Sequence, residues 1–308
     1  MTLRLGTRRS ALALAQSGGV AATILATLGR EVELVEITTR GDVDATALTQ
    51  IGGTVVFVTA LRDALYDGRI DLAVHSLKDL PTAAADGLVV VAVPPREDPR
   101  DVLCHPGGLT LGELPSGTRI GTGSPRRSAQ LLALGLGVVI VPIRGNVDTR
   151  LKKAIDAVDV DAVVLARAGL ARLDRLDAVS ETIDPIQLLP SPGQGALAIE
   201  CRADDAELVG LLRALDDPDS RACVDAERAL LAALEAGCTA PVGALADVAD
   251  DEIYLRAVVA AVDGSDVIRR SLTGPIGDPD ALGRRLAAIL LEDGAAELLG
   301  AGGFGPRR

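Results

Sequence analysis

Aromatic side chains are nearly absent from this chain of 308 residues, which has no tryptophan, two tyrosines and two phenylalanines. Large rings usually supply much of a protein core, so alanine, leucine and valine must supply it here. Binding of single-stranded nucleic acid by base stacking needs exposed rings, and this mode of recognition is excluded. The scarcity favours a site built from charged side chains and backbone groups.

Lysine is scarce as well, with three residues against 28 arginines, and the net charge is −12. A chain of this charge has little general affinity for DNA or RNA, and we expect no nucleic-acid partner. The basic residues are nevertheless concentrated. Residues 119–175 hold ten basic and five acidic side chains and carry +5, which leaves −17 for the rest. This stretch predicts a local site for a small anion.

Three further absences bear on the compartment. The first nine residues turn basic before any long apolar segment, so we expect no signal peptide. No apolar run approaches the roughly 18 residues of a membrane span, so we expect no membrane partner. The cysteines lack CxxC spacing, which predicts neither a metal site nor a disulfide framework; they are Cys104, Cys201, Cys223 and Cys238. We expect a cytoplasmic protein.

Short apolar segments alternate with helical ones through the first two thirds of the chain. Ser10 is the expected N-cap of a helix that runs to about residue 28, and the polar segment 41–54 is expected to be a loop. The other elements expected in this first block are strands at 3–6, 31–38, 70–74 and 88–93 and a helix at 58–66.

A second block repeats the pattern, and the tail departs from it. The second block has expected strands at 119–121, 138–141 and 161–165 and helices at 124–134 and 147–158. A strand at 196–200 is expected to return to the first block. The tail has expected helices at 204–215 and 219–235, strands near 253–262 and 267–270, and a helix from 278.

This order of elements predicts two α/β domains that flank a cleft, followed by a small α+β domain. The expected bounds are 1–94 with 195–213 for the first domain, which is discontinuous, 100–190 for the second, and 218–308 for the third.

Arg126 and Arg127 lie in the first turn of an expected helix, after a strand and the loop 121–124. Loop amides, a helix N-terminus and two guanidinium groups form a good anion site. Cations in a first turn oppose the helix dipole, so their position indicates that an anion lies beside them. The alternative is a solvated basic face. Arg144 repeats the pattern, between a strand end and the start of the next helix.

Asp79 stands beside Lys78 just after a buried strand, where ligands bind in open α/β sheets. Such a carboxylate can hold a cationic intermediate and move protons; the alternative is an aspartate that caps the next turn. His75, within the apolar strand, is interpreted as a structural histidine.

Cys238 lies in a glycine- and proline-containing loop after a helix, where a functional thiol and a packing residue are both open interpretations. No histidine is close in sequence, so a Cys–His nucleophile pair has no support. Cys201 and Cys223 are interpreted as packing residues.

Nine segments together resemble, in order, the porphobilinogen deaminase (hydroxymethylbilane synthase) family over nearly the whole chain. They are GTRRSALA at 6–13, TRGD at 39–42, AVHSLKDLP at 73–81, REDPRD at 96–101, GTGSPRR at 121–127, RGNVDTRL at 144–151, PGQGA at 192–196, AER at 226–228 and the loop around Cys238. Each segment alone is weak, whereas nine in order are highly specific.

The resemblance implies a monomeric transferase of tetrapyrrole (haem) biosynthesis, with two periplasmic-binding-protein-like α/β domains flanking the cleft and a small α+β C-terminal domain. Four porphobilinogen molecules would be joined head to tail into linear hydroxymethylbilane, with release of ammonia, so the partners are porphobilinogen and growing linear oligopyrroles. It also implies a dipyrromethane cofactor, held by a thioether to the cysteine that matches Cys238. Asp79 matches the catalytic aspartate.

Other residues match family contacts to carboxylate-bearing groups. The matches for cofactor binding are Lys78, Thr122, Ser124, Arg126 and Arg127. The matches for substrate binding are Arg8, Ser10, Gln16, Arg144, Arg150, Arg172 and Gln194. Arginine suits this task because its planar fork binds a carboxylate bidentately, and Asp79 would steady the cation that forms when ammonia leaves.

Two positions depart from the family pattern: Thr54 stands where a lysine is usual, and Gly123 where a serine is frequent. Two other functions stay open on the residues alone. A solute-binding module predicts no need for Cys238 or Asp79, and a thiol enzyme predicts that Cys238 turns over as a free nucleophile.

Overall fold

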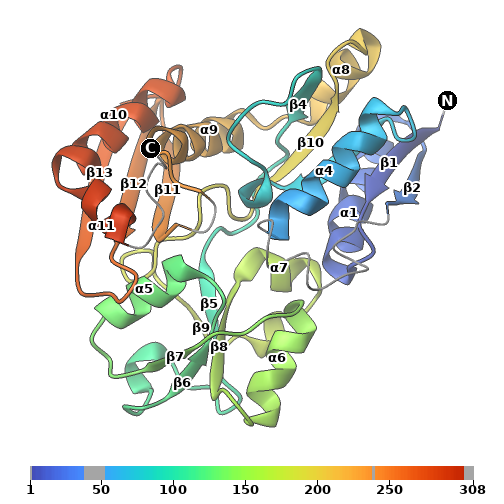
Figure 1. The fold of residues 1–308 in the computed structure, drawn as a ribbon. Helices are drawn as coiled ribbons and strands as arrows, with labels where there is room; N and C mark the ends of the chain where they lie inside the picture. Colours follow the sequence, from blue (N-terminus) through green and yellow to red (C-terminus); the bar gives the residue numbers. More distant parts are fainter. Residues whose placement is uncertain (1, 38–52, 238–239, 302–308) are drawn as a thin grey trace. The chain divides into compact units, whose positions relative to one another are not determined.

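The structure is a computed structural model that describes residues 2–37, 53–237 and 240–301. It divides into two compact units, which are Met1–Glu97 with Ala196–Arg221 and Asp98–Gly195 with Ala222–Arg308 (Figure 1). The expected loop at 41–54 falls outside the described residues, except that helix α4 already begins at Gly53. Cys238 also falls outside them.

The first unit is built on a five-stranded sheet of order β2-β1-β3-β10-β4. The strands are β1 (Leu3–Thr7), β2 (Val32–Glu36), β3 (Leu72–Ser76), β4 (Leu88–Ala92) and β10 (Leu197–Arg202). β1 is parallel to β2 and β3, whereas β10 lies antiparallel between β3 and β4. The expected return of this late strand to the first block is confirmed.

Helix α1 (Ala11–Leu28) begins and ends at the predicted positions. The Ser10 hydroxyl accepts from the backbone N–H of Ala13 as the N-cap, and Gly29 ends the helix at φ 63°. The helix contains no charged residue and has a mean hydropathy of 1.6, so by length and composition it could cross a membrane. The segment Gln16 to Gly19 interrupts its apolar run, and the expectation that the chain has no membrane partner stays a prediction.

In the structure α1 lies on the sheet of the first unit, with Val20 and Ile24 buried in the core beside Leu3 and Leu5. The remaining helices of this unit are α4 (Gly53–Tyr66), the 3-10 helix η1 (Leu77–Asp79), α8 (Ala206–Leu212) and the 3-10 helix η4 (Arg213–Leu215). α4 begins earlier than predicted and β3 ends two residues later, which leaves η1 directly after the strand.

The second unit contains a five-stranded sheet of order β7-β6-β8-β5-β9. Its strands are β5 (Asp101–Cys104), β6 (Arg119–Gly121), β7 (Val139–Val141), β8 (Ala162–Ala166) and β9 (Glu181–Thr182), and its helices are η2 (Leu111–Glu113), α5 (Pro125–Ala133), α6 (Val147–Asp156), α7 (Arg167–Arg172) and η3 (Leu176–Ala178). Sequence reasoning missed β5 and β9, since each is too short to show a period.

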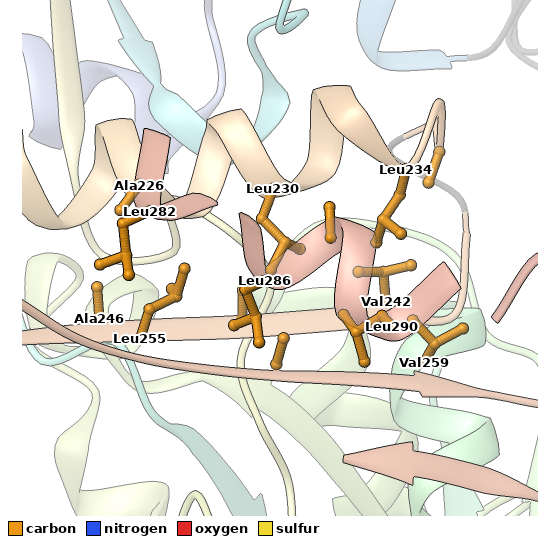
Figure 2. Packing of buried hydrophobic residues seen from close by; sticks show 14 of the residues in the cluster. Ala226, Leu230, Leu234, Val242, Ala246, Leu255, Val259, Leu282, Leu286 and Leu290 are labelled. Carbon is orange, nitrogen blue, oxygen red and sulfur yellow. The ribbon is translucent and has the colours of Figure 1, made fainter. Parts of the chain in front are cut away.

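A three-stranded antiparallel sheet, β11-β12-β13, completes the second unit. Its elements are α9 (Pro218–Ala233), β11 (Val242–Ala249), β12 (Glu252–Ala260), β13 (Val267–Pro275), α10 (Pro279–Glu292) and α11 (Ala295–Ala301). Figure 2 shows leucines of α9 and α10 packed against the apolar face of this sheet. β11 was missed because its alanine-rich sequence has low strand propensity.

The predicted fold class, two α/β domains and a small α+β C-terminal domain, is confirmed. The expected core composition is confirmed too. Tyr66 and Tyr254 are exposed, and the buried hydrophobic side chains of the described residues include no aromatic ring. The finer bounds predicted for the second and third domains stay a prediction.

Candidate functional site

Seven of the predicted site residues lie in two clusters, one within each unit, together with His75, which was expected to be structural, and Asp101, which was not predicted. The Asp79 cluster of the first unit consists of Arg8, Gln16, His75, Lys78 and Asp79. The Asp101 cluster of the second unit consists of Asp101, Arg126, Arg127 and Gln194. In the described ranges 2–37, 53–237 and 240–301, no histidine, cysteine, aspartate and glutamate side chains gather in a group that could hold a metal ion.

The Asp79 cluster lies at the carboxyl ends of β1 and β3. These strands are parallel neighbours, so the residues that follow them emerge at the same edge of the sheet. Arg8 follows β1, whereas Lys78 and Asp79 lie in η1 after β3. Gln16 on α1 donates from Nε2 to Oγ of Ser76 at 2.9 Å, which ties the helix to the end of β3.

Asp79 is a half-buried carboxyl surrounded by cations. Burial raises its pKa above the ordinary value, and the positive charges of Lys78, Arg8 and His75 oppose this rise without cancelling it. None of these cations is joined to Asp79 by a hydrogen bond that shifts the pKa. The carboxylate is therefore available to a positively charged group of a ligand.

Behind Asp79 lies a buried network centred on Glu200. Its carboxylate accepts from Nε and Nη2 of Arg62 at 3.1 and 2.8 Å and lies 3.1 Å from Nε2 of His75. Burial alone would raise the pKa of Glu200, but the hydrogen bonds with His75 and Arg62 hold it below its usual range. His75 is buried and has a polar partner, as a structural histidine would, and Glu200 is the partner that sequence reasoning did not identify.

In the Asp101 cluster, one carboxylate holds two guanidinium groups. Asp101 opens β5 and has 0% of its surface exposed. Its Oδ2 accepts from Nη2 of Arg126 at 2.8 Å, and its Oδ1 accepts from Nη2 of Arg127 at 2.7 Å. Nη1 of Arg126 donates to the carbonyl of Leu189 at 2.5 Å, and Nη1 of Arg127 to that of Val164 at 3.0 Å. An anion does lie beside the arginine pair, and the chain itself supplies it.

Each of the two arginines nevertheless has one nitrogen without a hydrogen-bond partner in the described part of the chain. Arg126 and Arg127 are 4% and 5% exposed, and within the described part of the chain their Nε atoms are buried without a hydrogen-bond partner. A buried, charged donor without an acceptor is unfavourable. The pair thus fits a ligand that brings its own acceptors, and carboxylate groups are the acceptors that a guanidinium binds best.

Electrostatics keeps Asp101 ionised. Its burial would raise its pKa, yet the charges of Arg126 and Arg127 and the hydrogen bonds from Arg127 and Gln194 hold that pKa far below the usual range. Gln194 donates from Nε2 to Oδ1 of Asp101 at 2.8 Å and to the carbonyl of Pro99 at 2.7 Å. Gln194, expected to bind substrate, therefore places its amide nitrogen against Asp101.

The other predicted residues of the second unit have their own hydrogen bonds. The buried hydroxyl of Thr122 accepts from the Ser124 N–H at 3.2 Å, and Ser124 is the N-cap of α5. Arg150 donates from Nε to the carbonyl of Gly145, and burial together with the charge of Arg127 lowers its pKa.

Arg172 and Arg144 differ in environment. Arg172 donates from Nη2 to the carbonyl of Gly195 at 2.6 Å. Arg144 is exposed. The structure thus places Arg126 and Arg127 on one internal carboxylate, whereas Arg144, Arg150 and Arg172 lie in the same unit without a hydrogen bond to Asp101 among those described.

The glycine at position 123 has a packing reason. A Cβ built there would lie 2.6 Å from the carbonyl oxygen of Ile143, closer than side-chain carbons approach backbone oxygens. A serine at this position, as the family pattern often has, would push the backbone at Ile143 away. The glycine in place of the family's frequent serine therefore goes with a close approach of the backbone at Gly123 to that at Ile143.

Asp101 and Glu200 are the two functional candidates that sequence reasoning missed. Asp101 stands in the quoted segment 96–101, but nothing in its spacing marks it as the partner of Arg126 and Arg127, which lie 25 and 26 residues further along the chain. The one available signal is a charged residue at the head of a strand that is otherwise apolar.

Three of the four cysteines are buried, namely Cys104, Cys201 and Cys223. Burial raises the pKa of Cys104 to about 12 and that of Cys201 to about 11. Since the thiolate is the reactive form, these two side chains are unreactive near neutral pH. Cys238 lies outside the described residues.

Two family models match the chain. "Porphobilinogen deaminase, dipyromethane cofactor binding domain" matches residues 3–210, and "Porphobilinogen deaminase, C-terminal domain" matches residues 221–292. The first match includes every residue of both clusters.

Curated relatives match over almost the full length. "Porphobilinogen deaminase 1" of Streptomyces avermitilis is 58% identical over 97% of each chain. "Porphobilinogen deaminase" of Mycobacterium tuberculosis is 55% identical over 96% of this chain and 98% of the relative.

Among solved structures, the methionine-binding protein MetQ matches 70% of this chain and 89% of its own, with 14% identity and a TM-score of 0.40. A periplasmic substrate-binding protein of an ABC transporter from Coxiella burnetii matches 71% and 94%, with 14% identity and a TM-score of 0.43.

Proposed function

The chain belongs to the porphobilinogen deaminase family, and from this premise we propose that it joins four porphobilinogen molecules head to tail into linear hydroxymethylbilane. Each condensation breaks a carbon–nitrogen bond of the substrate, forms a carbon–carbon bond to a pyrrole carbon that gives up its proton, and releases one ammonia. Water then cleaves the finished chain from the cofactor and supplies the hydroxyl group of the product. The single observation that carries the proposal is the match of the dipyrromethane-binding family model to residues 3–210. The buried arginine pair with two unpaired Nε donors supports it independently.

The arginines bind the acetate and propionate groups of the growing chain. Arg126 and Arg127 have buried donors ready for carboxylate oxygens, and Arg150 lies close enough to Arg127 for their charges to interact. A protein of net charge −12 would repel a polycarboxylate, and this positive region offsets the repulsion. In this proposal Arg144, Arg150, Arg172 and Gln194 serve the substrate, together with Arg8, Ser10 and Gln16 of the first unit.

Asp79 stabilises positive charge. When ammonia leaves, the substrate is left as a cation, which arginines alone would disfavour. A carboxylate that is half-buried, and that no cation of the described residues neutralises by direct pairing, provides the opposite charge. Its raised pKa also lets it hold a proton at a higher pH than an ordinary aspartate does.

A dipyrromethane cofactor supplies the nucleophilic pyrrole end onto which the chain is extended. In this proposal Lys78, Thr122, Ser124, Arg126 and Arg127 hold it, and a thioether to Cys238 attaches it. Two of the other cysteines, Cys104 and Cys201, are poor candidates for the attachment because burial raises their thiol pKa values. We assign the enzyme to the transferases, acting as a cytoplasmic monomer without a nucleic-acid or membrane partner.

Intact mass spectrometry of the purified chain tests this proposal. We expect a mass excess that corresponds to two linked pyrrole units, and we expect Cys238→Ala to lose it together with the activity. Cys104→Ala, a matched control at a buried cysteine, should retain the excess. An active protein with no added mass would contradict the proposal, and so would a Cys238→Ala variant that still carries the cofactor.

A further inference from the structure

Asp101 occupies a position that none of the predicted binding roles explains. It is completely buried, and it accepts hydrogen bonds from Arg126, Arg127 and Gln194 at 2.7 to 2.8 Å. Asp101 accepts from Nη2 of Arg126 and from Nη2 of Arg127, and none of its surface is exposed. It therefore has no surface that a ligand could contact. Its carboxylate therefore acts on a ligand only through the arginines.

The carboxylate also determines which donors stay available. With Nη1 fixed on the carbonyls of Leu189 and Val164 and Nη2 fixed on Asp101, each guanidinium is held from two sides. The one guanidinium nitrogen of each arginine that has no hydrogen-bond partner in the described part of the chain is then Nε, which is buried. Holding the plane of a guanidinium fixes the direction in which Nε–H points, because the group is rigid.

The Asp101 cluster is in turn connected to the C-terminal part of the second unit. Gln194 binds Asp101 through its side chain, and the neighbouring Gly193 donates its N–H to Oε2 of Glu227 at 2.6 Å. Glu227 is 0% exposed and lies on α9, and its Oε1 accepts from the N–H of Ala246 in β11 at 2.8 Å. A continuous hydrogen-bonded path thus runs from the C-terminal sheet to the arginine pair.

We propose that Asp101 is a positioning residue, which orients Arg126 and Arg127 so that both Nε donors converge on the carboxylates of one ligand, and that Gln194 fixes Asp101 in this task. The inference rests on the proposed function, since the ligand is the polycarboxylate named there. The negative charge of Asp101 also balances one of the two positive charges of Arg126 and Arg127. This reduces the repulsion between the two arginines, while one net positive charge remains to attract an anion.

An asparagine at position 101 would break this arrangement while keeping the side-chain shape. One of its two terminal atoms is an NH₂ donor, which would face the Nη2 donor of Arg126 or Arg127. That arginine would have to turn away, and its Nε would no longer point at the ligand. Small displacements of positioning groups change rates strongly, so we expect cofactor uptake by the apo chain to slow by roughly tenfold to 100-fold.

The experiment follows cofactor uptake directly, without relying on turnover. Apo wild type, Asp101→Asn, Arg127→Gln and the double variant are incubated with porphobilinogen, and the fraction with added mass is recorded over time. Asp161→Asn is the matched control, because Asp161 pairs with Arg119 in the same unit but at the surface; it should load within about twofold of wild type. If Asp101 acts through Arg127, its substitution should slow uptake much less in the Arg127→Gln background than in wild type.

A second variant covers the case in which Asp101→Asn does not fold. Gln194→Met keeps the side-chain size and leaves the ion pairs in place, and we expect its uptake to slow several-fold without a large change in melting temperature. A folded Asp101→Asn that loads like Asp161→Asn would overturn the inference, as would a Gln194→Met that loads like wild type when Asp101→Asn is unfolded. A wild-type chain that gains no mass at all would instead overturn the proposed function, and the inference with it.

Discussion

Each unit of the chain places one aspartate among cations, and the two aspartates have opposite properties. Asp79 in the first unit has a raised pKa, and Asp101 in the second has a strongly lowered one. The number of positive neighbours does not explain this, because Lys78, Arg8 and His75 all act on Asp79. The difference lies in contact. Asp101 accepts short hydrogen bonds from its cations, whereas the cations of the described residues near Asp79 change its pKa by their charge alone.

This comparison separates two uses of the same side chain. A carboxylate in direct contact with two arginines is fixed in charge and position, so it serves to organise other groups. A carboxylate that is partly desolvated and unpaired keeps its capacity to accept positive charge or a proton from a ligand. Direct pairing therefore distinguishes a positioning carboxylate from a catalytic one more reliably than the count of nearby charges does.

The largest effect is expected from Asp79→Asn. Turnover should fall by roughly 100-fold or more, because asparagine cannot offset positive charge on the substrate, while the mass excess of the cofactor should persist. Steady-state assays and intact mass on the same preparation provide both values. Near-normal turnover would show that Asp79 is not the catalytic carboxylate.

Relative to wild type, we expect Asp101→Asn to lower the free energy of unfolding and Asp79→Asn to leave it equal or raise it. Asp101 has a lowered pKa, so its charge stabilises the fold above the unfolded-state pKa, and this stability is lost only as pH falls through the folded-state pKa. Removing one partner of such a buried pair costs about 3–5 kcal/mol. Asp79 has a raised pKa, so its ionised form disfavours the folded state above that pKa.

Thermal melts near neutral pH should therefore show a lower melting temperature for Asp101→Asn and an equal or higher one for Asp79→Asn. Asp161→Asn, at a surface pair, should change stability by less than about 1 kcal/mol. Equal destabilisation by both aspartate substitutions would remove the distinction between the two sites.

A smaller effect is expected from Lys78→Met on the pH profile. The charge of Lys78 lowers the pKa of Asp79, so its removal should raise that pKa further. The loss of activity on acidification should then begin at a higher pH than in wild type, in kcat profiles from about pH 5 to about pH 9. Lys152→Met, at an exposed lysine on α6, is the control, and an identical profile for both variants would show that Asp79 does not set the acid limb.

The smallest effect is expected from Gly123→Ala beside the Asp101 cluster. A Cβ there would lie 2.6 Å from the carbonyl oxygen of Ile143, so we expect a loss of about 1–3 kcal/mol in stability and cofactor uptake a few-fold slower. Gly112→Ala is the matched control, since no atom lies within 4 Å of its added Cβ. Equal melting temperatures for the two variants would contradict the close approach.

Much of the fold could be predicted because its signals are local. Ser10 and Gly29 mark the ends of α1, and Ser124 marks the start of α5, since capping depends on neighbours in the sequence. The strands β5 and β11 were missed because pairing with distant strands, and not their own pattern, creates them.

The sites show the same limit. Arg126, Arg127 and Asp79 could be identified as candidates from their place after a strand. The environments that set their roles could not, because Asp101 and Glu200 reach their partners only in the folded sheet. Sequence reasoning thus identified residues that carry charge, but not the acid that controls them.

The place of β10 in the first sheet has a consequence for synthesis of the chain. β10 ends at Arg202 and fills the gap between β3 and β4, so the first sheet stays incomplete until two thirds of the protein has left the ribosome. All strands of the five-stranded sheet in the second unit precede β10 in sequence. On a translating ribosome the strands of that second sheet are therefore all made first. Strands β1 to β4, within residues 3–92, wait with an open edge for a strand made after them.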